Sequence, residues 1–164
     1  MSVAAGAGST EAQYAYLRKE GMLSIVINSV LSLLFFLMTF GVDPAGAIRV
    51  GDVGGYAFDF LPQSFMVALM SALVPGAITA ARIRGGKIAG APEAAEALVV
   101  RSLLTAVLAL AVGGLIAFVL TLVAGTTAFA WIPALVAKIF YGAILAAIVT
   151  PVGLRTALRR AVFH

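Results

Sequence analysis

The chain has 164 residues, of which 62% are hydrophobic and only 11% are charged, and its mean hydropathy is +1.09. Soluble domains carry roughly 25% charged residues, so this composition excludes a soluble globular domain and a disordered chain. The sequence contains no cysteine, which also excludes a disulfide-stapled secreted module.

Two charge-free stretches, residues 21–42 and 60–81, predict one membrane-spanning helix each. About 20 helical residues are needed to cross a hydrocarbon core of about 30 Å. Ala45-Gly46-Ala47 resembles the cleavage site of a signal peptide. The apolar run before it is longer than the roughly 7–15 residues of such a signal, so we expect a retained helix.

A longer charge-free stretch, residues 102–137, is too long for one crossing and is interrupted by Gly125-Thr126-Thr127. We therefore predict two further spans, at 102–124 and 132–154. The expected fold is an all-α integral membrane protein, one domain of residues 1–164, with four transmembrane helices in a compact bundle of two hairpins. The remaining segments are a helix start at 1–20, outer loops at 43–59 and 125–131, and a cytoplasmic loop at 82–101.

Proline and capping residues mark the expected helix starts. Pro62, Pro92 and Pro133 occupy first-turn positions, where a missing N–H group is tolerated. Thr10-Glu11-Ala12-Gln13 has the pattern of a capping box, which predicts that a helix starts there and continues toward the first span.

The distribution of Lys and Arg predicts the orientation in the membrane. Almost all basic residues lie on one side of the predicted topology, so both termini are expected in the cytoplasm. This side is expected to meet anionic lipid headgroups rather than nucleic acid. The residues concerned are Arg82, Arg84, Lys87, Arg155, Arg159 and Arg160. A preference for arginine over lysine, with abundant alanine and glycine, is typical of GC-rich bacterial genomes and favours the bacterial inner membrane.

Small or hydroxyl-bearing residues recur at every fourth position of each span, a pattern that lets helix backbones approach in lipid. The stripes are Ser24, Asn28 and Ser32; Ser64, Ala68, Ala72, Gly76 and Ala80; Thr105, Ala109, Gly113, Ala117 and Thr121; and Gly142, Ala146 and Thr150. Gly76, Gly113 and Gly142 are therefore candidate packing residues. Their faces could meet helices of the same chain, a second copy or other membrane subunits.

Lys138 is the one ionisable residue inside a predicted span, and such residues are functional candidates because their burial in hydrocarbon is costly. It lies only about 8 Å along the helix axis from the expected helix start at Pro133. The favoured interpretation is that its side chain snorkels to the headgroups beside Trp131. The alternatives are a salt bridge to Asp52 or Asp59 and the binding of an anion.

Asn28 and two prolines are further candidates for special roles. The amide of Asn28 must find a partner inside the first span, and an interhelical hydrogen bond is favoured over ligand or ion coordination. Pro75 and Pro151 lie inside helical runs, where each frees the carbonyl four residues earlier, those of Ser71 and Ala147. We expect kinks there, which transporters use as hinges or ion ligands.

Catalytic and cofactor chemistry has little support in the sequence. The aspartates of the outer loop match no calcium-loop pattern, and its aromatic residues Tyr56, Phe58 and Phe60 are expected to form an interfacial belt. The sole histidine is His164, so no histidine pair is available for haem or zinc. We therefore expect no enzyme activity, no cofactor and no metal.

A faint internal repeat relates the two halves of the chain. Aligning Phe65 with Tyr141 also aligns Pro75 with Pro151 and Arg84 with Arg160. A hairpin with a proline late in its second helix, followed by basic residues, resembles a group of short two-span bacterial inner-membrane proteins of unknown function. By this resemblance, the chain would be two such hairpins in tandem.

Two functions are therefore carried forward. The first is a non-catalytic structural or accessory subunit of a membrane complex or homo-oligomer. The alternative is a small transporter or channel subunit that works as an oligomer, although few polar residues are expected in its interior. Lys138→Leu is expected to abolish transport in the second case and to leave a scaffold intact in the first.

Overall fold

The computed structural model describes residues 3–87 and 93–162, with side chains for Ala15, residues 18–87 and residues 93–154. In these ranges it contains four helices and a two-stranded ribbon. Their order is α1 (Val3–Phe40), β1 (Ala47–Arg49), α2 (Phe60–Arg84), α3 (Ala95–Ala124), β2 (Ala128–Ala130) and α4 (Trp131–Val162).

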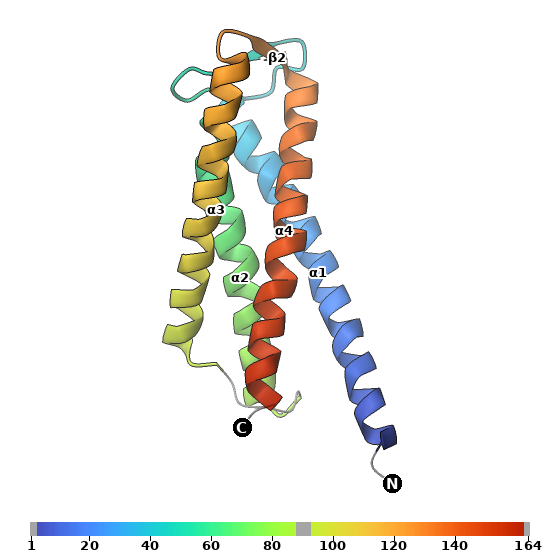
Figure 1. The fold of residues 1–164 in the computed structure, drawn as a ribbon. Helices are drawn as coiled ribbons and strands as arrows, with labels where there is room; N and C mark the ends of the chain where they lie inside the picture. Colours follow the sequence, from blue (N-terminus) through green and yellow to red (C-terminus); the bar gives the residue numbers. More distant parts are fainter. Residues whose placement is uncertain (1–2, 88–92, 163–164) are drawn as a thin grey trace.

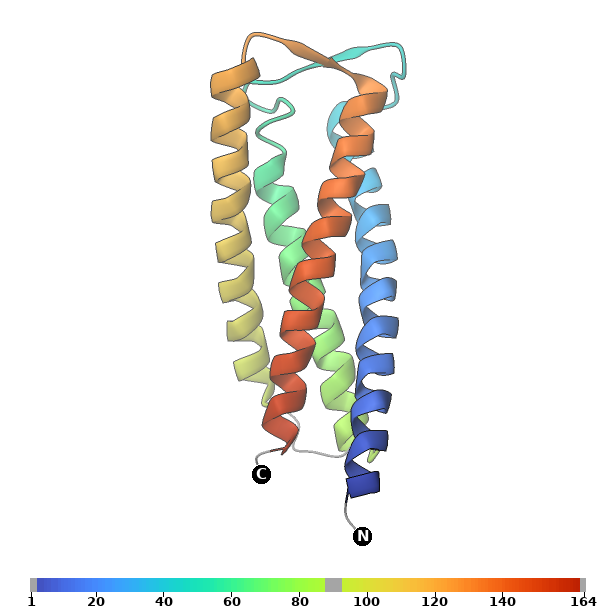
Figure 2. The ribbon, with the colours of Figure 1, turned by 45° about the vertical axis from the view of Figure 1, so that its right-hand side comes forward.

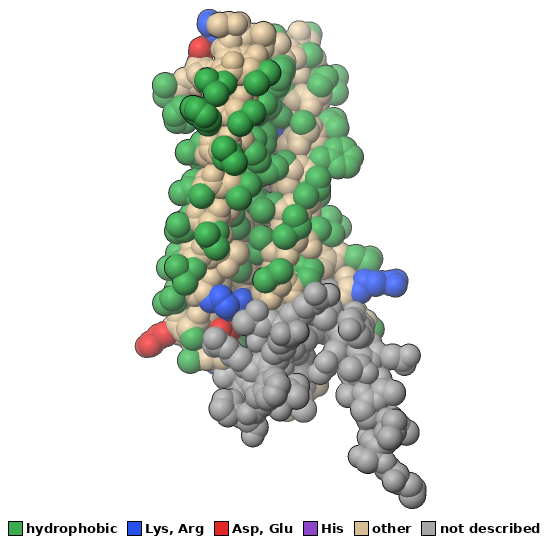
Figure 3. Space-filling view, in the orientation of Figure 1, with side chains coloured by type: hydrophobic (Ala, Val, Ile, Leu, Met, Phe, Trp, Pro, Cys, Tyr) green, Lys and Arg blue, Asp and Glu red, His purple; other side chains and the backbone are tan. Residues whose placement is uncertain are grey.

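Each of the four helices is long and apolar enough to cross a membrane. The segments concerned are Arg18–Phe40, Phe60–Arg84, Ala95–Ala124 and Trp131–Leu154. The predicted all-helical architecture with four candidate spans is therefore confirmed. On the face shown in Figure 3, apolar side chains cover the long middle part of the molecule, and most of the charged side chains lie near its two ends.

The helices lie side by side, with the ribbon at one end and both ends of the chain at the other (Figures 1 and 2). We call these the ribbon end and the terminal end. The most closely packed pairs are α2 with α3 and α1 with α4, followed by α2 with α4. The hairpin helices α1 and α2 pack much less closely on each other. The two helices of each predicted hairpin follow one another in the chain, but each packs more closely on a helix of the other hairpin.

Helix α1 differs from the prediction at its start. It already begins at Val3, so the predicted capping box is wrong and Thr10 lies within the helix. Its other end is set by Gly41, which has a φ of +67° and whose N–H group donates to the carbonyl of Leu37 at 2.9 Å. Such a left-handed glycine is a common helix ending, because it has no side chain to clash in this conformation.

The ribbon was not predicted from the sequence. Its two strands are antiparallel and pair Ile48 with Phe129, so that it joins the two loops that connect the helices. Beneath it lies an apolar cluster in which Phe36 and Trp131 make an edge-to-face contact at 5.4 Å between ring centroids. The indole N–H of Trp131 also donates to the carbonyl of Gly41 at 3.2 Å. The ribbon end is therefore a folded cap over the helices.

Below this cap the interior contains small and polar side chains. One apolar cluster consists of Ala68, Ala72, Ala109 and Val149. The buried face of α1 carries a polar residue at every fourth position from Glu20 to Ser32. Bulky apolar residues face outward, as in α3, where Leu108 and Leu122 are largely exposed. This arrangement suits a lipid surround, where small residues allow close helix contact.

Candidate functional site

The ribbon end holds a buried ion pair between α4 and the start of α2. The Lys138 ammonium lies 3.1 Å from Oδ2 of Asp59, the residue just before α2. Lys138 is 0% exposed and Asp59 is 6% exposed. The contact is an ion pair rather than a well-directed hydrogen bond. Asp59 also accepts a long hydrogen bond from the Thr39 hydroxyl of α1, at 3.4 Å.

Aromatic rings complete the surroundings of this ammonium group. Its nitrogen lies 3.4 Å from the ring centroid of Phe60 and 4.9 Å from that of Tyr56. The negative face of an aromatic ring attracts a cation, and the attraction increases when water is excluded. The aromatic residues of the outer loop were expected to form an interfacial belt, but Tyr56 and Phe60 are buried and face Lys138. Only Phe58 of this group is exposed.

The favoured sequence interpretation of Lys138 is therefore wrong. Its side chain does not snorkel to the surface, because the loop before α2 folds over it and supplies Asp59. The salt bridge to Asp59 was one of the alternatives. The other predicted partner, Asp52, instead pairs with Arg49 on the surface at 2.7 Å.

The ionisation of the Tyr56 hydroxyl provides a test of whether the surroundings of Lys138 are buried. Its hydroxyl donates to the carbonyl of Ala134 at 3.1 Å. Burial, together with the negative charge of Asp59, raises the pKa of Tyr56 from 10.0 to about 12. The folded protein thus holds this proton more tightly than the unfolded chain, so the resulting stabilisation is complete below pH 10 and is lost as the pH rises through about 12.

We therefore expect one tyrosine to ionise near pH 12. The measurement is the near-ultraviolet absorbance of the wild type during an alkaline titration, from which the curve of Tyr56→Phe is subtracted to isolate this residue. A difference curve with its midpoint near pH 10, the ordinary value, would contradict the buried position of Tyr56.

Gln63, one turn into α2, links three helices below the ion pair. Its amide nitrogen donates to the Ser32 hydroxyl of α1 at 2.9 Å and to the backbone carbonyl of Lys138 in α4 at 3.0 Å. The amide oxygen of Gln63 has no hydrogen-bond partner among the described residues. Sequence reasoning missed Gln63 because it stands beside Pro62 at the start of a span, where a polar residue is expected to face the headgroups.

Two of the predicted packing glycines lie against hydroxyl groups at this level. A Cβ atom on Gly113 of α3 would overlap the Ser64 hydroxyl and come within 2.6 Å of the Phe60 carbonyl. A Cβ atom on Gly142 of α4 would overlap the Ser32 hydroxyl. The Ser64 hydroxyl also contacts the Phe60 carbonyl, and it lies 2.6 Å from the Tyr141 hydroxyl. Because Gly113 and Gly142 have no side chain, the Ser64 and Ser32 hydroxyls have room beside α3 and α4.

A second polar cluster surrounds Asn28 nearer the terminal end. The Asn28 amide nitrogen contacts the Ser24 carbonyl at 2.8 Å, the Ser24 hydroxyl at 3.2 Å and the Ser71 hydroxyl at 3.0 Å. It therefore makes the interhelical hydrogen bond that was favoured, from α1 to α2. The Ser24 hydroxyl lies 2.7 Å from the Thr150 hydroxyl of α4.

Pro75 contributes to this cluster through the carbonyl that it frees. A proline at position 75 cannot donate to the carbonyl of Ser71, and the Thr150 hydroxyl donates to that carbonyl at 3.4 Å. The predicted free carbonyl is thus bonded across to α4 rather than available to an ion. The helix is continuous through Pro75, and α4 is likewise continuous through Pro151.

Two further ion pairs lie at the terminal end. Glu20 of α1 accepts from Arg82 of α2 at 3.0 Å. Arg101 of α3 pairs with Glu93 at 3.0 Å and donates to the carbonyl of Gly153 in α4 at 3.3 Å. Near them, a Cβ atom on Gly76 would overlap the end of the Leu98 side chain.

The basic residues predicted to meet lipid headgroups thus differ in their surroundings. Arg82 is partly buried in its pair with Glu20, whereas Arg84 and Lys87 are exposed. Arg155, Arg159 and Arg160 lie in the last turns of α4, outside the described side chains. His164 lies outside the described residues.

Taken together, these groups form a column of buried polar side chains between α1, α2 and α4. From the ribbon end to the terminal end its members are Asp59, Lys138, Gln63, Ser32, Asn28, Ser71, Ser24, Thr150 and Glu20. The expectation of few polar residues in the interior is therefore wrong. Glu20 is also a carboxylate within a candidate span, and it is only 5% exposed.

Comparisons with protein-family models, with curated proteins and with solved structures find no match to this chain. Among the described residues, no group of three or more His, Cys, Asp or Glu side chains could hold a metal ion. The polar column can hold helices together by hydrogen bonds or, if its pairs open, pass a proton or a small ion.

The buried position of Glu20 was predictable from the helical periodicity of α1. It lies four residues before Ser24, on the same stripe as Asn28 and Ser32. The prediction placed it outside the membrane because it is charged. Its pairing with Arg82 depends on the contact between α1 and α2 at the terminal end, which the sequence does not reveal.

Proposed function

We propose that this chain is a non-catalytic structural or accessory subunit, in a membrane complex or in a homo-oligomer. The observation that carries the proposal is that buried polar groups bond to one another across helices α1, α2 and α4. The residues that make these hydrogen bonds are Ser24, Asn28, Ser71 and Thr150. Hydrogen bonds of this kind between helices serve to fix the positions of the helices.

Helix α3 gives a reason to expect assembly. Within the described chain it packs closely along its length on α2 alone. Figure 2 shows α3 at the edge of the molecule, beside α2 and away from α1. Much of its bulky apolar surface therefore remains open to lipid or to another subunit.

The proposed setting is the bacterial inner membrane, with both termini in the cytoplasm. The support is the excess of basic residues on the side of the termini, and the location of both ends of the chain at the terminal end (Figure 1). Arg84 and Lys87 would then face anionic headgroups. A reporter fused after His164 should behave as cytoplasmic, and a periplasmic signal would contradict this orientation.

The test of the subunit proposal is the mass of the intact complex. The protein should be isolated from its source membrane in native-lipid particles. We expect either other proteins in a fixed ratio or a defined homo-oligomer. A bare monomer, under conditions that preserve known complexes from the same membrane, would contradict the proposal.

The second candidate is a small transporter or channel subunit, favoured by the buried Lys138–Asp59 pair at the head of the polar column. Ionisable residues inside membrane bundles often mark ion or substrate pathways. The variant Lys138→Leu does not discriminate between the candidates, because it leaves Asp59 unpaired in either case.

A double variant, Lys138→Met with Asp59→Leu, removes both charges and is the better test. In proteoliposomes, a transport pathway through this pair predicts ion or proton flux in the wild type and its loss in the double variant. Arg49→Ala, which removes the surface pair with Asp52, is the matched control and should retain flux. Absence of flux in the wild type, or equal flux in the double variant, would contradict this candidate.

A further inference from the structure

A groove at the ribbon end leaves one edge of strand β2 open. Its volume is about 360 Å³, and it runs between the three residues of β2 and the first turns of α4. Its walls include Tyr56 from the loop before α2 and the small side chains of Pro133 and Ala137 from α4. Ala128 and Ala130, the two ends of β2, are exposed. The backbone of β2 is therefore accessible from this side.

The hydrogen bonds of the ribbon determine which backbone groups of β2 are left open. The Trp131 N–H group donates to the Gly46 carbonyl at 3.1 Å, so these two residues form a hydrogen-bonded pair. Such pairs alternate with non-hydrogen-bonded pairs along an antiparallel ladder, so Phe129 bonds to β1, whereas Ala128 and Ala130 point their N–H and C=O groups away from it. Because α4 begins at the next residue, the Ala130 carbonyl accepts the first bond of that helix. The open groups are thus the N–H of both alanines and the carbonyl of Ala128.

The two edges of the ribbon differ in how they are covered. The loop before α2 closes the outer edge of β1, because the Tyr56 N–H group donates to the Arg49 carbonyl at 2.9 Å. No backbone hydrogen bond of this kind reaches Ala128 among the described residues. Open edges are usually protected by charged residues or proline, and residues 125–132 contain neither. Strand β2 is therefore suited to pair with another strand.

The orientation of the ribbon limits which strand can be added. Ile48 is buried and Phe129 packs against the apolar cluster beneath the ribbon, while their neighbours in the two strands are exposed. Side chains alternate between the two faces of a strand, so the ribbon lies across the helix ends with one face toward them (Figure 2). The perpendicular to the ribbon therefore runs along the helices.

A second copy of this chain fits that geometry. Two antiparallel strands that pair edge to edge are related by a two-fold axis perpendicular to their sheet. Here this axis runs along the helices, and hence across the membrane that the helices would span. Both copies then cross the membrane in the same direction, as copies with the same distribution of basic residues must.

We propose that β2 of a second copy pairs with this edge, with Ala128 opposite Ala128 of that copy. Each Ala128 N–H group donates to the Ala128 carbonyl of the other copy, and each Ala130 N–H group faces the Thr126 carbonyl of the other copy. The two ribbons join into one four-stranded sheet, and the small side chains of Pro133 and Ala137 leave room for the added strand. The same surface is used on both copies, so the assembly closes as a dimer. The proposal rests on the subunit function and specifies its homo-oligomeric form.

Cysteine cross-linking tests this register, because the chain has no cysteine of its own. With the full chain of Ala128→Cys in liposomes, we expect oxidation to give a disulfide-linked dimer, since Cα atoms of a hydrogen-bonded pair lie about 5.5 Å apart. Arg49→Cys is the matched control, because Arg49 lies opposite Ala128 on β1 and is also exposed. The two Arg49 positions of the dimer would be three strand spacings apart, about 14 Å, and should not cross-link.

A proline variant tests the hydrogen bonds themselves. Ala128→Pro removes an N–H group that the ribbon does not use, at the first residue of an edge strand, where proline is tolerated. We expect the dimer Kd, measured by fluorescence energy transfer between labels on the exposed loop position of Val53→Cys, to rise on the order of tenfold or more, because two reciprocal hydrogen bonds are lost. The alkaline titration of Tyr56 verifies that the ribbon end stays folded in the variant.

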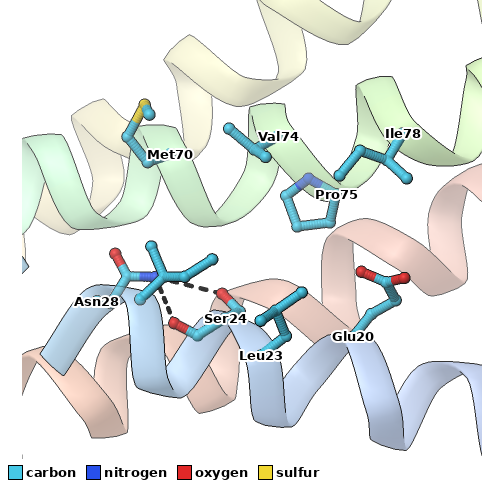
Figure 4. Close-up of a pocket in the computed structure, with 9 residues that line it drawn as sticks. Glu20, Leu23, Ser24, Asn28, Met70, Val74, Pro75 and Ile78 are labelled. Atoms are coloured by element: carbon cyan, nitrogen blue, oxygen red, sulfur yellow. Dashed lines mark hydrogen bonds between the residues drawn. The ribbon is translucent and has the colours of Figure 1, made fainter. Parts of the chain in front are cut away.

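Two control variants change other parts of the surface. Ala47→Pro removes the equivalent outward N–H group at the first residue of β1. Val74→Phe changes the apolar pocket between α1 and α2, which lies on other helices (Figure 4). Both should leave the Kd of the dimer unchanged.

Failure of this interface can be distinguished from failure of the subunit function. Equal cross-linking of the Ala128→Cys and Arg49→Cys variants, or an unchanged Kd for Ala128→Pro, would overturn the β2 interface and leave a homo-oligomer formed through another face. Cross-linking of Ala128→Cys only to a different protein in the source membrane would overturn it and leave an accessory subunit. A chain that is monomeric in liposomes and isolated alone from its source membrane would contradict both.

Discussion

Lys138→Met is expected to destabilise the protein by about 3–5 kcal/mol, the cost of leaving one member of a buried ion pair without its partner. The Asp59 carboxylate would remain buried at 6% exposure, and among the described side chains it would keep only the long hydrogen bond from Thr39. The contacts of the ammonium with the Phe60 and Tyr56 rings would also be lost. The measurement is the free energy of unfolding in bicelles, obtained by steric trapping.

The double variant Lys138→Met with Asp59→Leu should recover most of this loss. Apolar residues of similar volume need no charge partner, and such replacements are often neutral or stabilising. Arg49→Ala serves as the control, because surface ion pairs contribute about 0–1 kcal/mol. Additive losses in the double variant would show that the two side chains do not interact.

Gly113→Leu is expected to destabilise the contact between α3 and α2 by about 1–3 kcal/mol or more, the usual range for overpacking. A Cβ atom at this position would lie 2.6 Å from the Phe60 carbonyl and 2.8 Å from the Cβ atom of Ser64. The carbonyl belongs to the backbone and cannot move aside without displacing α2. The readout is the free energy of unfolding, measured as for Lys138→Met.

The neighbouring glycine provides a matched control. A Cβ atom on Gly114 would meet nothing within 4 Å, so Gly114→Leu should change the stability by less than about 0.5 kcal/mol. Both substitutions replace a helical glycine with the same residue, one position apart, and thus share the gain in helix propensity. Equal effects of the two would refute close packing of α3 on α2 at Gly113.

Gly76→Leu should have an intermediate effect. Its closest neighbour is the end of the Leu98 side chain, which can change its rotamer, rather than the backbone of another helix. The three predicted packing glycines therefore differ in the kind of atom they face. Their sequence pattern is the same, and only the neighbouring helix distinguishes them.

The inward stripes of α1 and α4 were predictable because helical periodicity places every fourth residue on nearly the same face. Asn28 could likewise be expected to make an interhelical hydrogen bond, since an amide in hydrocarbon needs a partner. Its partner could not be named. Ser71 lies on a helix that is separated from α1 by a long loop, and many hydroxyl groups occur in the other spans.

The sequence by itself determined the class of this protein: four helices, each long and apolar enough to cross a membrane, with charges near their ends. Hydrocarbon requires each spanning segment to satisfy its own backbone hydrogen bonds, so composition and length suffice for that conclusion. Only the tertiary structure decided that α2 packs on α3 and α1 on α4, and that Lys138 is buried against Asp59. The burial of Lys138 depends on the loop before α2, which supplies Asp59 and follows a ribbon formed by two segments far apart in the chain. The pairing of residues so distant is a property of the packed helices and is not encoded in any local pattern.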